Sequence, residues 1–209
     1  MNKLNPYFFL SIVFISEYFL GTILVVVISI LFEKFNYFNF ISHDLIVFFV
    51  KILLSFVLFK VLIRENFKKY FFIYLPKINI VIYTILLSFC YYVLYKLIFD
   101  GNFSLMFKFN KFGSSNVYFF SAIIFGPIYE ELLYRGYGIE YLKQNKQNNL
   151  KIILFTSLIF SMVHLPYMNQ VISTFFLGIF CSLIYLKYKN LSYAIIFHVA
   201  FNFFALNLF

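Results

Sequence analysis

The stretch NVYFFSAIIFGPIYEELLYRGYGIEYL, residues 116–142, decides the fold because it is apolar over most of its length and yet contains charged side chains. A helix of about 20 apolar residues crosses the hydrocarbon core of a bilayer. Glu130, Glu131 and Arg135 interrupt this apolar run. Because each charge costs about 2.5–3.5 kcal/mol at the centre of a membrane helix, we expect the three side chains to face a bundle interior or a wet cavity.

The composition of the whole chain agrees with a membrane protein. Of its 209 residues, 63% are hydrophobic and 12% are charged, too few charges for the hydrated surface of a soluble domain. The net charge of +9 is typical of cytoplasmic loops in a membrane protein and requires no nucleic-acid partner. A soluble globular domain, a disordered chain and a nucleic-acid-binding module are therefore excluded as first interpretations.

Apolar runs predict an all-α, polytopic membrane helix bundle with about seven transmembrane helices, in a single transmembrane domain over residues 1–209. Only helices satisfy their own backbone hydrogen bonds in lipid with runs of this kind, since the alternating pattern of barrel strands is absent from the sequence. The fifth and sixth runs are short for full spans. The seven runs are 7–32, 44–63, 78–99, 117–141, 150–165, 171–186 and 191–209.

Basic residues in the loops predict the orientation of the chain. Ten lie at the N-terminus and in alternate loops, against three in the opposite loops. This imbalance predicts a cytoplasmic N-terminus, and the compact length favours a bacterial cytoplasmic membrane. The ten are Lys3, Arg64, Lys68, Lys69, Lys77, Lys143, Lys146, Lys151, Lys187 and Lys189, and the three are Lys34, Lys108 and Lys111.

The spacing of the charges in the fourth run indicates a pair and a free acid. Glu131 and Arg135 are four residues apart and share a helical face, whereas Glu130 points about 100° away from Glu131. One acid can therefore pair with Arg135 while the other keeps a carboxylate for chemistry. The structural alternative for these charges is a salt bridge at a helix end.

Pro127 adds a second feature to the same run. It removes one backbone donor and leaves the Ile123 carbonyl without its helical partner, which predicts a kink one turn before the acids.

Two later runs contain further polar side chains. The fifth places His164 four residues after Phe160, and Pro166 then ends or bends the helix. The seventh places His198 and Asn202 four residues apart on one face. Each of these residues has a structural alternative, because polar side chains in membranes also join helices by hydrogen bonds.

This set of polar groups has the chemistry of a hydrolase that cuts amide bonds in or beside a membrane. A carboxylate and two imidazoles can bind Zn²⁺ or activate water directly, and a guanidinium, imidazole or amide can stabilise an oxyanion. The H-E-x-x-H and Walker motifs are absent from the sequence. Cys90 and Cys181 lie in apolar runs and are interpreted as small core residues.

In chain order these residues form the motifs Glu130-Glu131-x-x-x-Arg135, Phe160-x-x-x-His164 and His198-x-x-x-Asn202. The ordered set resembles the CPBP intramembrane protease family, also called Abi. That family includes the CaaX prenyl proteases and bacteriocin-processing or self-immunity proteins. The resemblance covers a catalytic core at about 115–205 and implies a helix bundle whose catalytic groups line a cavity within the membrane.

The resemblance also implies roles for the individual residues. Glu130 would activate water with the help of His164, and Glu131 would pair with Arg135 and hold the site. His198 would stabilise the oxyanion.

Asn202 would act with His198 on the oxyanion. In a metal-dependent version, Glu130, His164 and His198 would hold Zn²⁺. The expected partners are a peptide or membrane-protein substrate and the lipid bilayer, with no nucleic acid. Two alternatives stay open, namely a non-catalytic bacteriocin self-immunity or scaffold protein and a transporter or proton relay.

Overall fold

The structure, a computed structural model, describes residues 5–34, 46, 49–50, 53, 72–99, 120–165 and 167–207. Regular structure in these residues is entirely helical, which confirms the all-α prediction. The segments Pro6–Leu31, Ile78–Phe99 and Met168–Tyr188 are long and apolar enough to cross a membrane.

Seven transmembrane helices are not confirmed, because the described residues form six continuous helices. Most of the predicted run 44–63, and Pro166, lie outside the described residues.

The third of these six helices is built from four consecutive segments. The six helices are α1 (Pro6–Lys34), α3 (Ile78–Phe99), the composite η4 (Ser121–Phe125), α5 (Gly126–Glu131), η5 (Leu132–Ile139) and α6 (Glu140–Gln144), then α7 (Asn149–Met162), α8 (Met168–Tyr188) and α9 (Leu191–Asn207). Both η segments are π-helical, a form that occurs mostly as single-turn bulges and often at functional sites.

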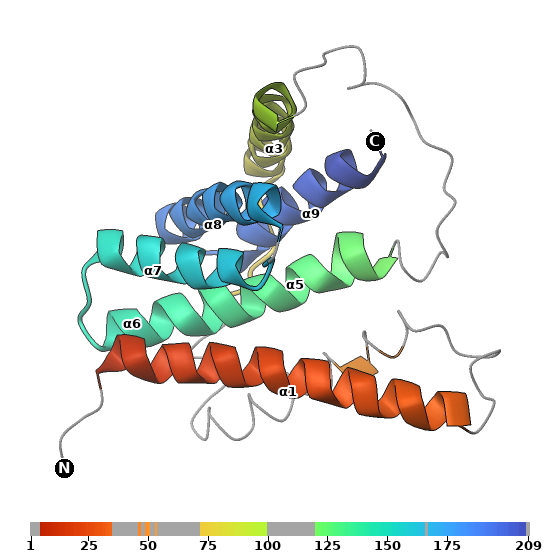
Figure 1. Cartoon of the computed structure of the whole chain (residues 1–209). Coiled ribbons are helices and arrows are strands. Elements are labelled where there is room, and N and C mark those ends of the chain that lie inside the picture. Colours follow the sequence, from red (N-terminus) through yellow and green to blue (C-terminus); the bar gives the residue numbers. More distant parts are fainter. Residues whose placement is uncertain are drawn as a thin grey trace.

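The composite helix occupies the middle of the bundle (Figure 1). Helices α7 and α8 pack side by side and both contact η5. Helix α9 packs against α3, α8, α5 and η4, while α1 contacts α6 and α7. This arrangement places α5, which contains both acids of the first motif, against the face of α9 that contains the third motif.

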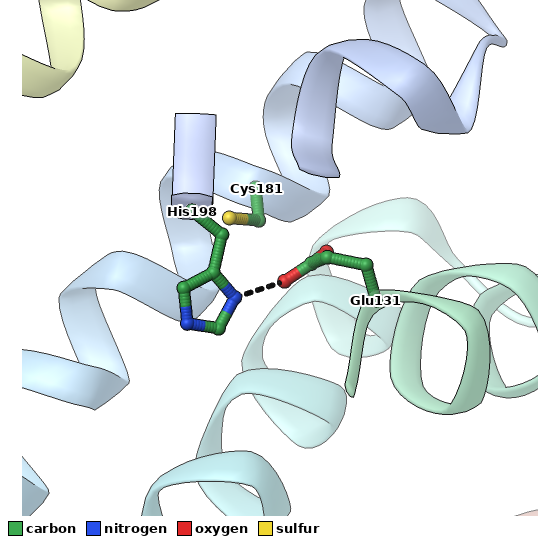
Figure 2. Close-up of side chains that lie close together, drawn as sticks. All are labelled: Glu131, Cys181 and His198. Carbon is green, nitrogen blue, oxygen red and sulfur yellow. Dashed lines mark hydrogen bonds and ion pairs between the residues drawn. The ribbon is translucent and has the colours of Figure 1, made fainter. Parts of the chain in front are cut away.

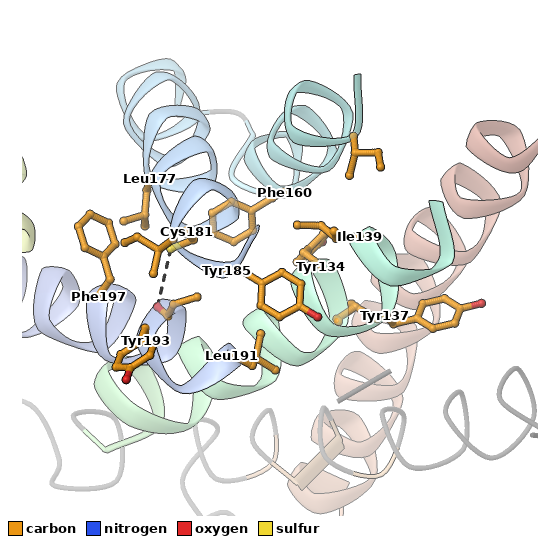
Figure 3. Packing of buried hydrophobic residues seen from close by; sticks show 14 of the residues in the cluster. Tyr134, Tyr137, Ile139, Phe160, Leu177, Cys181, Tyr185, Leu191, Tyr193 and Phe197 are labelled. Atoms are coloured by element: carbon orange, nitrogen blue, oxygen red, sulfur yellow. Dashed lines mark hydrogen bonds between the residues drawn. The ribbon is translucent and has the colours of Figure 1, made fainter. Parts of the chain in front are cut away.

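Aromatic side chains fill the space between these helices (Figure 3). The Tyr134 ring of η5 lies 4.8 Å from the Phe14 ring of α1 and 5.2 Å from the Phe160 ring of α7, measured between centroids. Tyr185 of α8 is buried and donates a hydrogen bond to Oε1 of Glu140 at 2.9 Å. The core therefore joins α1, α7 and α8 around the composite helix.

A strap without helix or strand, residues 72–77, leads into α3 and lies against the connection between α8 and α9. Leu191 donates its backbone N–H to the Phe72 carbonyl at 2.7 Å. The Asn190 side-chain amide makes two hydrogen bonds to the Tyr74 backbone. Its oxygen accepts from the Tyr74 N–H and its nitrogen donates to the Tyr74 carbonyl, each at 3.2 Å. Oδ1 of Asn190 also accepts from the Ser192 N–H at 3.1 Å.

Replacing Asn190 by Ala is expected to lower the free energy of unfolding by about 1–3 kcal/mol, because three partly buried hydrogen bonds to backbone groups are lost together. Asn190 is 5% exposed and joins segments that are 116 residues apart. Denaturant unfolding in detergent micelles measures the change.

The control is Asn145→Ala, which removes an exposed bond to the nearby Tyr141 carbonyl. Equal effects of the two substitutions would contradict a specific role for the strap contact.

Candidate active site

The two acids of the first motif stand at the end of α5, between the two π-helical segments. Glu131 is completely buried, whereas the Glu130 side chain is 20% exposed. Neighbouring residues on a helix point about 100° apart, so Glu131 faces the core while Glu130 lies on a more exposed side of the helix. The predicted division into a paired acid and a more available acid is therefore present in the structure.

Glu131 is the centre of a buried cluster. Its Oε1 accepts a hydrogen bond from Nη1 of Arg135 at 2.9 Å and lies 2.9 Å from Nδ1 of His198 (Figure 2). Arg135 is 0% exposed and His198 is 2% exposed. Because an unpaired charge in such a place is very costly, the guanidinium is what allows the Glu131 carboxylate to be buried.

The contact with Glu131 orients the His198 ring. When Nδ1–H donates to the carboxylate, the other nitrogen, Nε2, points away from Glu131. Nε2 lies 3.7 Å from Oε2 of Glu130. The imidazole therefore stands between the two acids, attached to the buried one and facing the partly exposed one.

Arg135 has two further contacts that hold its guanidinium plane. Nη2 donates to the Gly178 carbonyl of α8 at 3.0 Å. The guanidinium carbon lies 4.6 Å from the centre of the Phe160 ring, a cation–π distance. The pairing of Glu131 with Arg135 that the spacing predicts is thus tied to α7 and α8 as well.

His164 borders this cluster through an aromatic ring. The Phe160 ring lies 5.5 Å from the His164 ring and 5.7 Å from the His198 ring, both with edge-on geometry. Nδ1 of His164 is 3.3 Å from the Phe160 carbonyl. The predicted shared face of Phe160 and His164 is present, and Phe160 is the residue that connects the second motif to the other two.

Asn202 reaches the composite helix one turn after His198. Its Nδ2 donates to the Ala122 carbonyl in η4 at 3.0 Å. The structure therefore joins all three motifs: Glu131 contacts His198, Asn202 contacts η4 about two turns before the acids, and Phe160 lies beside Arg135.

Two site residues on α8 were missed as such by the reasoning from sequence. Cys181 is buried as predicted, but it also lies beside the cluster, and Gly178 supplies the carbonyl that holds Arg135. A signal for both exists in the sequence, because Gly178, Cys181 and Ser182 are small residues at helical spacing. Such residues let neighbouring membrane helices approach closely.

The predicted zinc ligands are not gathered as a ready set of donors. Among the residues that the structure describes, the group of His, Cys, Asp or Glu side chains with donor atoms within 4.8 Å of one another is Glu131, Cys181 and His198. In that group, Oε1 of Glu131 is already bonded to Arg135 and His198.

The part of the chain that contains this site matches a known protein family. Residues 112–204 match the Rce1-like family. Its description is type II CAAX prenyl endopeptidase Rce1-like, so the match confirms the resemblance to the CPBP or Abi proteases. The matched stretch contains the composite helix, α7, α8 and most of α9, and with them all three motifs. No curated protein and no solved structure matched the chain.

The Rce1-like match has two direct consequences. The matched family is one of proteases, which are hydrolases with peptide or protein substrates. Together with the three apolar helices of spanning length, it indicates an integral membrane protein. The order and the contacts of the motifs agree with this match.

Replacing Gly178 by Ala is expected to lower the free energy of unfolding by about 1–3 kcal/mol, because the added methyl group overpacks the α7–α8 contact. A Cβ atom there would lie 2.9 Å from Cβ and 3.0 Å from Cα of Ser157, and 3.1 Å from Nη2 of Arg135. Denaturant unfolding in micelles measures the effect.

Gly138→Ala is the matched control, since the atom nearest to its Cβ would be the end of the Phe14 ring at 3.0 Å, and the nearest backbone atom, the Leu133 carbonyl oxygen, would lie at an ordinary 3.6 Å. A larger loss for Gly138→Ala than for Gly178→Ala would contradict the close approach of α7 and α8.

Proposed function

We propose that this protein is an intramembrane endopeptidase that hydrolyses a peptide bond in a small or membrane-associated peptide. The observation that carries the proposal is the asymmetry of the two adjacent acids. Glu131 is buried and bonded to Arg135 and His198, whereas Glu130 is partly exposed and lies beside Nε2 of His198. Such an arrangement supplies one carboxylate for chemistry and one for support.

In the proposed reaction, Glu130 acts as the general base. It takes a proton from water while the water oxygen forms a bond to the carbonyl carbon of the substrate. The carbon–nitrogen bond then breaks, and the proton held by Glu130 passes to the departing amine. The products are a carboxylic acid and an amine, which balances the addition of one water molecule. His164, at the border of the site, assists in holding the water.

His198 and Asn202 stabilise the oxygen of the carbonyl as it gains negative charge. Protonated His198 donates one N–H to Glu131 and can donate Nε2–H to the oxyanion. The Glu131 carboxylate compensates the positive charge on this imidazole, and Arg135 holds Glu131 in place. Glu131 and Arg135 therefore act by positioning His198.

The cellular setting forms part of the same proposal. The loop charges support a cytoplasmic N-terminus in a bacterial cytoplasmic membrane. A peptide precursor or bacteriocin, cut within or beside that membrane, is the substrate class that fits this setting.

Glu130→Gln is expected to lower cleavage at least about 100-fold, because the amide cannot accept the proton from water. The measurement compares peptide termini in membranes from cells that express the wild type or the variant at matched levels. Termini that appear only with the wild type identify the substrate as well as the activity.

The matched control is Glu140→Gln, the same change nine residues after Glu131 in the composite helix. A Gln there keeps an oxygen acceptor for Tyr185, so cleavage should persist. Equal turnover by purified Glu130→Gln and wild type would rule out the mechanism. Identical termini, with any protective phenotype retained by the variant, would favour a binding or self-immunity protein.

Zinc bound by Glu130, His164 and His198 is a separate proposal. It is supported by two of its donor atoms, Oε2 of Glu130 and Nε2 of His198, which lie 3.7 Å apart. A zinc ion there would act as a Lewis acid and activate water. The expected result is one zinc per chain by elemental analysis, lost in His164→Ala. Zinc content that is the same in the variant would contradict this ligand set.

A further inference from the structure

The carbonyl of Ala122 is freed from helical hydrogen bonding by the local sequence. The Gly126 N–H, which would serve this carbonyl in an α-helix, donates instead to Ser121, five residues back. In a π-helix the donor would be residue 127, but that residue is Pro and has no N–H. Neither helical register therefore supplies a donor for the Ala122 carbonyl.

The Asn202 side chain supplies the hydrogen-bond donor that Pro127 lacks. Its Nδ2 donates to the Ala122 carbonyl at 3.0 Å, across the contact between α9 and η4. Because the amide group is planar, this bond fixes its plane and directs the second N–H of Nδ2. The bond also satisfies a carbonyl that would otherwise be costly in an apolar bundle.

The same face of α9 is anchored to the composite helix at a second point. His198, four residues before Asn202, is bonded to Glu131, which is nine residues after Ala122. The two anchors lie on either side of Pro127, which is itself buried. The segment between them contains Glu130, so the bonds of His198 and Asn202 together set where the α9 donors stand relative to the attacking water.

We propose that Pro127 is a positioning residue, which orients the Asn202 amide toward the oxyanion by keeping the Ala122 carbonyl free to accept its hydrogen bond. This inference rests on the proposed peptidase function for its catalytic consequence. The orientation of Asn202 is a separate, structural consequence that requires no activity. The experiment below measures both.

The catalytic test is a double-mutant cycle on purified protein. Pro127→Ala restores an N–H that competes for the Ala122 carbonyl, and it should lower kcat about fivefold or more with KM unchanged. Asn202→Ala should lower kcat about 100-fold, as expected for loss of an oxyanion donor. In the Asn202→Ala background, Pro127→Ala should have no further effect, because Pro127 acts through Asn202. Pro76→Ala, in the strap, is the matched control.

The structural readout is NMR of the Asn202 side-chain amide in protein labelled with ¹⁵N-asparagine. The signal is identified by its loss in Asn202→Ala. One of its two protons should exchange slowly with water in the wild type and at least about tenfold faster in Pro127→Ala. Pro76→Ala should leave that rate unchanged.

Several outcomes would overturn the inference. Equal losses of kcat caused by Pro127→Ala in both backgrounds would show that Pro127 acts independently of Asn202. Unchanged exchange in Pro127→Ala would show that this proline does not free the carbonyl. If Pro127→Ala does not fold, rapid exchange of both amide protons in the wild type would still refute the bond. A wild type without peptidase activity but with the predicted exchange would refute only the proposed function.

Discussion

The structure depends on one buried carboxylate. Glu131 has no access to water, and its Oε1 is shared by the guanidinium of Arg135 and the imidazole of His198. An isolated carboxylate in such a place would be very costly, so the helices that supply these partners must be held at a fixed distance. The requirement reaches α8, whose Gly178 carbonyl holds Arg135, and α7, whose Phe160 ring packs against the guanidinium.

This dependence links the stability of the bundle to its chemistry. The absence of a side chain at Gly178 lets α8 lie close to both Ser157 of α7 and the Arg135 guanidinium, which donates to the Gly178 carbonyl. The oriented His198 then faces Glu130, the more exposed acid. Packing, burial and the position of the reacting groups are therefore consequences of the same contacts. The segment that matches the Rce1-like family, residues 112–204, contains all of them.

Much of this arrangement was accessible from the sequence. Hydrophobic runs predicted an all-helical membrane protein, and the spacing of Glu131 and Arg135 predicted their pair. The direct contact of His198 with Glu131 was not predicted, because spacing along one helix does not show contacts between residues that are 67 apart in the chain. The sequence also did not reveal the two π-helical segments, which change the rise and register of the composite helix. Cys181 and Gly178 were missed because an apolar run does not show which small residues face a charged neighbour.

The π-helical turn at Ser121–Phe125 also has an evolutionary consequence. A single π-turn is equivalent to an α-helix with one residue inserted, and one residue corresponds to about 100° of rotation. Deleting a residue there would turn both acids away from α9 without altering any motif. A relative whose helix is α-helical at this place would be one residue shorter before its acids. Its sequence would then align correctly only with a gap at this turn, which lies outside the three motifs.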